Sequence, residues 1–335
     1  MKRIIFVVLI IIVGSFKCFS KQSKLNVIER TDFSIHYDAA NKENLKSYYE
    51  FPKLNRKYGF KITDKDLNEQ IKKARYIDLP IVQIDSRKLS RIIIEGLNIG
   101  FLLNNIENRK LVVTTISEDI HDDYIERELL FEDEYVGTFC VLMLVPSVKK
   151  NKYPVVVGFH GHGSNSFDFW DNYMGIELVR QGFVVIIPFF RAMVNFRERK
   201  YDNILSRYLL QEGFTLMGIR VYESLLVLKY LKYNDMINNE RIGALAHSGG
   251  SAAASLIVRL SNDIKAFVRD YRSNYLDFFV EVKQFGSIHC ETIPALSYYR
   301  NTINNEETLA IPVLNVPYGF KEEKHKILEF FAKNL

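Results

Sequence analysis

The chain has 335 residues, 47% of them hydrophobic, and a formal net charge of +5. This length and apolar content allow one large domain or two smaller ones with a full core. Three of the 45 basic residues lie in the first twenty positions, which hold no acid, so the rest carries 42 basic and 40 acidic residues. This near-neutral balance gives no electrostatic reason to expect binding to nucleic acid or to an acidic membrane.

The N-terminus has the pattern of a secretory signal. Lys2 and Arg3 precede an apolar run over residues 4–13, and small or polar residues follow it. The run is too short for an ordinary membrane-spanning helix, and it predicts a signal peptide over residues 1–20 that is cleaved after Ser20. We therefore expect a secreted or periplasmic protein. The alternative is an uncleaved segment that anchors the chain in a membrane.

Only two cysteines, Cys140 and Cys290, remain after that cleavage. They allow one disulfide but no disulfide scaffold, and the sequence leaves open whether they pair. The sequence contains no CxxC motif and no His/Cys group at zinc-binding spacing. We therefore expect neither a metal nor a cofactor.

Residues 21–127 are predicted to form an N-terminal extension of unclear role. This part is rich in Lys, Asn and Tyr, and helical stretches are predicted over residues 64–75 and 91–103. It contains no internal repeat and no low-complexity linker. The segment therefore gives little information about chemistry.

From residue 128 onward, apolar runs alternate with helical ones. A hairpin with strands over 129–131 and 138–145 comes first. Further strands are predicted over 153–159, 183–188, 241–246, 265–270, 284–289 and 311–317, and helices over 169–181, 214–233, 251–259 and 324–333. Continuous Val, Ile and Phe runs between helices indicate an α/β domain with a mostly parallel central sheet covered on both faces. Such a sheet places reactive groups at the carboxyl ends of its strands.

The segment Ala246-His247-Ser248-Gly249-Gly250 follows the strand predicted over 241–246. Small residues stand two before and two after Ser248, as a sharp strand-to-helix turn with an exposed nucleophile requires. The segment resembles the G-x-S-x-G elbow of the α/β-hydrolase family, with Ala246 in place of the first glycine. The alternative is an ordinary serine at a helix N-cap.

A second motif, His160-Gly161-His162-Gly163, directly follows the strand predicted over 153–159. It resembles the H-G-x-G oxyanion loop of the same family. The resemblance implies that the amides of Gly249 and of His162 or Gly163 bind the negative charge that develops on the substrate. We interpret His160 as a structural histidine, because His160 and His162 lack a third metal ligand at suitable spacing.

The same family places an acid and then a histidine after the serine. Only two histidines, His289 and His325, follow Ser248. His325 comes after the last predicted strand and just before the final helix, which is the position of the family's general base. The resemblance implies that Glu291, after the penultimate strand, is the acid that orients this base, with Asp270 after the preceding strand as the alternative.

The resemblance covers about residues 128–335 and is nearest to the dienelactone hydrolase and acetyl xylan esterase branch. It implies a serine hydrolase that cleaves small or carbohydrate carboxylic esters through an acyl-enzyme and needs no cofactor. One alternative is a serine peptidase of the prolyl-oligopeptidase type, but the segment before residue 128 is too short for a propeller domain. The other is a non-catalytic binding protein with a hydrolase-like fold.

Overall fold

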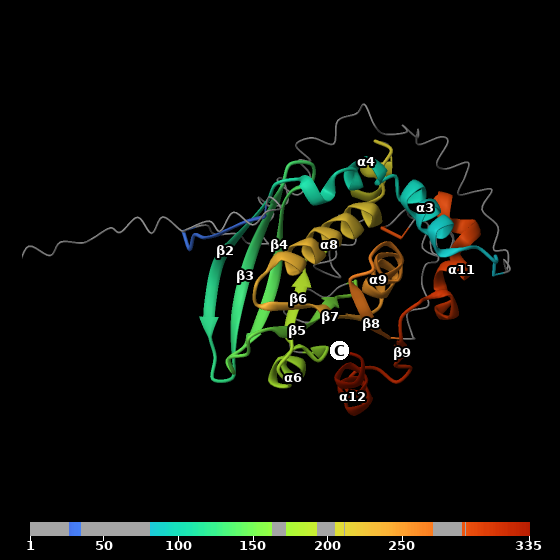
Figure 1. The fold of residues 1–335 in the computed structure, drawn as a ribbon. Coiled ribbons are helices and arrows are strands. Elements are labelled where there is room, and N and C mark those ends of the chain that lie inside the picture. Colours follow the sequence, from blue (N-terminus) through green and yellow to red (C-terminus); the bar gives the residue numbers. More distant parts are fainter. Residues whose placement is uncertain are drawn as a thin grey trace, which may run out of the picture.

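The computed structural model describes residues 27–34, 81–162, 172–192, 205–210, 212–270, 290–291 and 293–335. Within these residues the strands form one nine-stranded sheet of order β1-β2-β3-β4-β6-β5-β7-β8-β9 (Figure 1). The strands are β1 (Val27–Thr31), β2 (Leu111–Ile120), β3 (Tyr124–Asp133), β4 (Gly137–Pro146), β5 (Tyr153–Phe159), β6 (Val184–Pro188), β7 (Ile237–Ala246), β8 (Ile264–Arg269) and β9 (Val313–Asn315).

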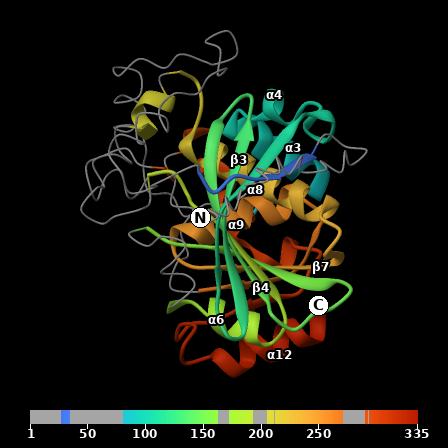
Figure 2. The same ribbon diagram turned by 90° about the vertical axis from the view of Figure 1, so that its left-hand side faces the viewer.

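Helices cover both faces of the sheet. They are α3 (Ser86–Leu97), α4 (Gly100–Leu103), α6 (Gly175–Arg180), α8 (Leu216–Tyr233), α9 (Gly249–Leu260), α11 (Arg300–Asn304) and α12 (Lys324–Asn334), with short 3₁₀ turns at Ile106–Asn108, Pro294–Tyr299 and Glu306–Thr308. Helices α3, α8 and α9 lie on one side of the sheet, and α6 and α12 lie on the other (Figures 1 and 2).

The core is divided by the sheet into two apolar layers. Val155 and Val157 of β5 belong to the layer that contains α3, α8 and α9, whereas Val156 belongs to the layer with α6 and α12. This alternation follows from the two-residue period of a strand. Because both layers are apolar, the central strands read as continuous hydrophobic runs, as the sequence indicated.

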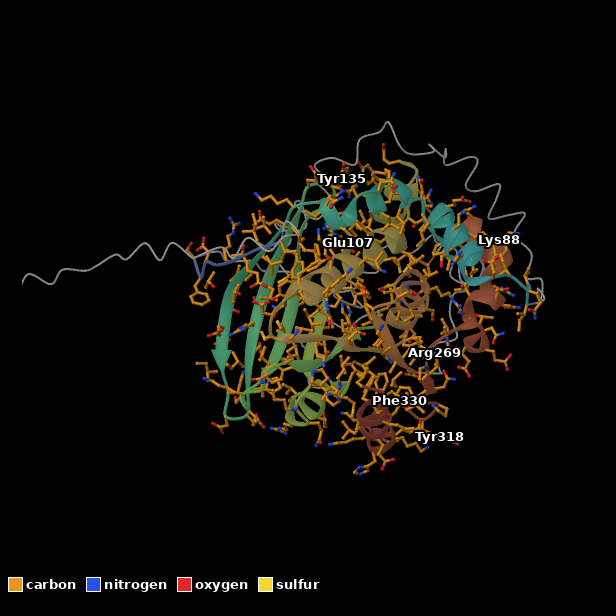
Figure 3. All side chains as sticks on the ribbon, viewed as in Figure 1. Lys88, Glu107, Tyr135, Arg269, Tyr318 and Phe330 are labelled. Carbon is orange, nitrogen blue, oxygen red and sulfur yellow. The ribbon has the colours of Figure 1, made fainter. Side chains whose placement is uncertain are left out.

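The parallel part of the sheet runs through β6, β5, β7, β8 and β9. The expected hairpin is present as β3 and β4, which pair antiparallel, and β4 joins the parallel part through antiparallel pairing with β6. Arg269, labelled in Figure 3, lies at the carboxyl end of β8. Its Nε donates to Asn315 Oδ1 at 2.8 Å and so connects β8 to β9. The strand predicted over 284–289 and the helix predicted over 64–75 lie outside the described residues.

The sheet extends further toward the N-terminus than residue 128. That position falls inside β3, and β2 and β1 belong to the same sheet. Strand β1 lies at the edge and pairs parallel with β2, with Val27 opposite Leu111. Arg30 Nε on β1 donates to Thr114 Oγ1 at 2.7 Å, across 84 positions of sequence.

Helix α8 corresponds to the helix predicted over 214–233, and it is buried on nearly all sides. The sheet covers one side, and the segment from α3 to residue 109 contacts another, where Lys229 Nζ donates to the carbonyls of Ile106 and Arg109 at 2.7 Å. The polar residues Arg220 and Glu223 are buried as well, and both bind Arg191 at the end of β6 rather than solvent. Within the described part of the chain, no helix is long and apolar enough to cross a membrane.

Candidate active site

Ser248 occupies the corner between β7, which ends at Ala246, and α9, which begins at Gly249. Its backbone has φ 50° and ψ −124°, a conformation that residues with a side chain rarely adopt. Its side chain makes no capping hydrogen bond to α9. A serine that merely caps a helix has extended backbone angles and accepts such a bond, so the ordinary N-cap explanation does not fit this corner.

Two glycines allow the corner to pack tightly. A Cβ atom placed on Gly250 would lie 2.1 Å from the carbonyl oxygen of Phe159, at the end of β5. A Cβ atom placed on Gly161 would lie 2.8 Å from Ser248 Cβ and 2.9 Å from His247 Cδ2. The predicted oxyanion loop therefore begins in direct contact with the predicted elbow, and neither glycine can be replaced without a shift of the backbone.

His247, directly before Ser248, is bound by a buried carboxylate. Its Nδ1 lies 2.9 Å from Oδ2 of Asp270, which is 5% exposed and follows β8. The amide of Asp270 also donates to the carbonyl of Ala246 at 3.0 Å, which fixes the carboxylate beside the elbow. Because a carboxylate accepts the Nδ1 proton, the neutral ring has its lone pair on Nε2. A Cβ atom placed on Gly161 would meet Cδ2 of this ring, so His247 packs against the start of the loop after β5.

Two aromatic side chains hold the same ring from the other layer. Tyr173, just before α6, stacks on His247 with ring centroids 4.4 Å apart. Phe320, between β9 and α12, meets it edge-on at 6.0 Å and also contacts Tyr173. The orientation of His247 is thus set by one carboxylate and two rings.

His162 lies in the loop after β5, next to two residues that are distant in sequence. Its Nε2 is 2.9 Å from Sγ of Cys290, and its Nδ1 is 3.7 Å from Oε1 of Glu291. Cys290 and Glu291 are both buried. Cys140 and Cys290 are free thiols, so they do not form the disulfide that the sequence allowed.

His160 is buried and holds the start of the loop. Its Nε2 accepts a hydrogen bond from the amide of Phe190 at 3.0 Å, and its Nδ1 lies 3.1 Å from the carbonyl of Gly161. The proton therefore sits on Nδ1 and is donated to Gly161. Burial lowers the pKa of His160 to about 3, so the ring is neutral at physiological pH. This histidine connects the ends of β5 and β6 and leaves no ring nitrogen for a substrate.

The remaining predicted residues are placed as follows. Gly249 is buried and begins α9, where its N–H has no acceptor within the helix. His325 is the second residue of α12, is exposed, and makes no hydrogen bond or ion pair with any described residue. Gly163 and His289 lie outside the described residues. The structure thus brings Glu291 to His162 and Asp270 to His247.

No family model and no curated protein matches this sequence. Solved structures do match its fold. The acetyl xylan esterase from Paenibacillus sp. R4 matches with a TM-score of 0.51 and 11% identity, over 80% of this chain and 99% of its own. Acetyl xylan esterase 1 from Thermoanaerobacterium sp. JW/SL YS485 matches with a TM-score of 0.51 and 14% identity, over 82% of this chain and 99% of its own.

The chain has the α/β-hydrolase fold. A further match, the putative acetyl xylan esterase from Bacteroides fragilis NCTC 9343, has a TM-score of 0.49 and 17% identity, and it covers 64% of this chain and 62% of its own length. At these identities the likeness concerns the fold. The α/β-hydrolase fold places Ser248 at the carboxyl edge of the sheet, where ligands bind in open α/β sheets.

The sequence did not reveal the contacts between residues that meet only in space. The pairing of His247 with Asp270 joins neighbouring strand ends, and the contact of His162 with Cys290 crosses 128 positions of sequence. The one sequence signal for the first pair was the position of Asp270 at the end of a predicted strand next to the elbow.

Proposed function

We propose that this chain hydrolyses carboxylic esters with Ser248 as the nucleophile. The backbone of Ser248 supports this proposal most directly. Its φ of 50° and ψ of −124° hold a side chain in a conformation that costs about 1–3 kcal/mol, and no capping bond compensates for it. Such strain typically occurs where a fold must present one reactive group, which is the purpose of a nucleophile elbow.

The general base that the geometry favours is His247. Asp270 accepts the Nδ1 proton and thereby leaves the lone pair on Nε2, in a ring that directly precedes Ser248 and packs against Gly161. In the proposed reaction, Ser248 Oγ attacks the ester carbonyl while His247 takes its proton. His247 then returns this proton to the departing alcohol and activates the water that releases the acid. The assignment from sequence, His325 oriented by Glu291, is the alternative that the experiment below tests.

The oxyanion site is proposed at the amides of Gly249 and His162, with Gly163 as the alternative to His162. Gly249 is supported by its position at the start of α9, where the helix dipole also favours negative charge. The second amide is supported by the contact that Gly161 makes with Ser248, which brings the loop after β5 to the nucleophile. Loss of one such donor typically slows hydrolysis about 100- to 1000-fold.

The substrate is proposed to be a small or carbohydrate ester, with an acetyl group as the first choice. The two solved structures with the higher TM-scores are both acetyl xylan esterases. The signal-like segment over residues 1–20 supports export, where carbohydrate polymers are accessible. N-terminal sequencing of the exported protein, with cleavage expected after Ser20, tests the second point, and a retained Met1 in a membrane fraction would contradict it.

A fluorophosphonate probe tests the nucleophile. We expect the probe to label the wild-type protein and to leave Ser248→Ala unlabelled. The rate on an activated acetyl ester should fall in parallel. Equal labelling of the two proteins would overturn the proposal.

The general base is identified by measuring kcat on the same ester for four variants, each of which replaces one histidine. We expect His247→Gln to lose at least about 100-fold in kcat, because general-base catalysis contributes about 100- to 10,000-fold. His121→Gln, at the turn between β2 and β3, is the control for removal of a histidine. If His325→Gln or His289→Gln shows the large loss and His247→Gln does not, the base is reassigned to that residue.

A further inference from the structure

Beside the proposed ester-hydrolysing site lies a group of three side chains with different ligand atoms. His162, Cys290 and Glu291 each offer one ligand atom, and these atoms lie within 4.8 Å of one another. Cys290 is 1% exposed and Glu291 is 2% exposed, while the side chain of His162 is 24% exposed. The group is therefore closed on the protein side and reachable from the side of His162.

The ligand types suit a borderline-soft divalent cation. A thiolate, an imidazole and a carboxylate are the ligands that zinc takes, and three protein ligands leave one position open. Calcium and magnesium prefer oxygen ligands only, so the cysteine disfavours them.

The distance between two of the ligand atoms is shorter than zinc coordination requires. Cys290 Sγ lies 2.9 Å from His162 Nε2, which is a hydrogen-bond distance. Zinc bonds of about 2.0 Å to nitrogen and about 2.3 Å to sulfur, at tetrahedral angles, separate these two atoms by about 3.5 Å. The sulfur and nitrogen must therefore move apart by about half an ångström when the cation replaces the proton. The partly exposed ring of His162 has room for such a shift.

We propose that His162, Cys290 and Glu291 bind a zinc ion with one open coordination position, next to but separate from Ser248. No spacing pattern in the sequence pointed to this site, because His162 and Cys290 are 128 positions apart. Since Gly161 contacts Ser248, the ion would fix the loop that carries the proposed oxyanion amide of His162.

Cobalt(II) is the probe, because a cobalt–thiolate bond gives a charge-transfer absorption band in the near ultraviolet. The full chain is freed of metal with a chelator and titrated with cobalt chloride. We expect one cobalt per chain with this band and with the visible bands of tetrahedral cobalt. Zinc chloride should then displace the cobalt and remove the bands.

The variants assign the band to its ligands. We expect Cys290→Ser to lose the charge-transfer band and Cys140→Ser, a matched loss of a buried thiol, to keep it. Glu291→Gln and His162→Gln should each weaken binding by more than about tenfold. Thermal unfolding without metal shows whether each variant is folded.

Two outcomes would overturn the proposal. The first is that the wild-type chain binds no stoichiometric cobalt, and the second is that Cys290→Ser keeps the band. In either case the thiol and the imidazole share a hydrogen bond only. Ser248→Ala should bind cobalt as the wild type does, so the metal site and the proposed hydrolysis can fail independently.

Discussion

Asp270 Oδ2 lies 2.9 Å from Nδ1 of His247, and these two residues stand at the ends of adjacent parallel strands. A carboxylate in this position selects the ring tautomer whose lone pair is on Nε2. The pair is held further by the bond between the amide of Asp270 and the carbonyl of Ala246. The strand pairing of β7 with β8 thus places the carboxylate that selects the tautomer of the residue before Ser248.

The first prediction concerns the acid. Asp270→Asn should lower kcat on an activated acetyl ester by about 100-fold or more, because an amide no longer enforces the tautomer that leaves Nε2 free to accept a proton. The loss in Asp270→Asn should exceed the loss in Glu291→Gln by at least about tenfold. The opposite order would assign the orienting role to Glu291, as the sequence-based interpretation has it.

The second prediction concerns the strain at the elbow. Ser248→Gly should be more stable than Ser248→Ala by about 1 kcal/mol, because glycine reaches φ 50° and ψ −124° without the clash of a Cβ atom. Both variants lack the hydroxyl and should be inactive, so the comparison isolates the backbone. Chemical denaturation of the two variants measures the difference, and equal midpoints would mean that the corner stores no strain.

The third prediction concerns Gly250. Gly250→Ala should destabilise the fold by about 3 kcal/mol or more, since its Cβ would lie 2.1 Å from the carbonyl of Phe159 and both are backbone-fixed. Gly100→Ala at the start of α4 is the control, because its Cβ would meet only the end of the Ile94 side chain at 3.4 Å. Urea unfolding should separate the two variants clearly, and a tolerated Gly250→Ala would show that α9 can move away from β5.

The fourth prediction concerns acid stability. The pKa of His160 is about 3 in the folded chain and about 6.5 in the unfolded chain, so between these values the unfolded state binds the additional proton. The stability that neutral His160 contributes is therefore complete above about pH 6.5 and falls as the pH is lowered toward 3. One such group changes the free energy of unfolding by up to about 1.4 kcal/mol per pH unit.

His160→Gln tests this dependence. The variant should be less stable at pH 7, because the bond to the amide of Phe190 is altered, but its stability should decline less steeply between pH 6.5 and pH 4. His325→Gln, at an exposed position on α12, serves as the control. Unfolding midpoints at several pH values give the slopes, and parallel slopes for wild type and His160→Gln would contradict the assignment.

The sequence predicted the central strands well because both of their faces are buried. The strand expected over 153–159 coincides with β5, since its run of apolar residues contacts both core layers. The helix predicted over 214–233 agrees closely with α8, which spans Leu216–Tyr233. The sequence did not predict which residues surround this helix. Its charged residues Arg220 and Glu223 lie in the interior, where Arg191 of a distant segment binds both of them.

The sharp corner at Ser248 could be predicted from sequence because its constraints are local. Ser248 needs small neighbours within two residues, and those neighbours are visible as Ala246 and Gly250. The partners of His247 and His162 depend on how the strand ends and loops meet in space. Spacing in the sequence does not predict these contacts. For this reason the sequence paired Glu291 with His325, whereas the structure places Glu291 beside His162.

The pairing of β1 with β2 affects the order in which the chain can fold. Val27 and Arg30 are made early in synthesis. Their partners on β2, Leu111 and Thr114, each lie 84 positions later in the sequence. The closure of so long a loop costs entropy that only the finished sheet edge can offset. During synthesis the strand β1 must therefore remain unpaired until β2 has followed it, and we expect β1 to add to the sheet as a late event.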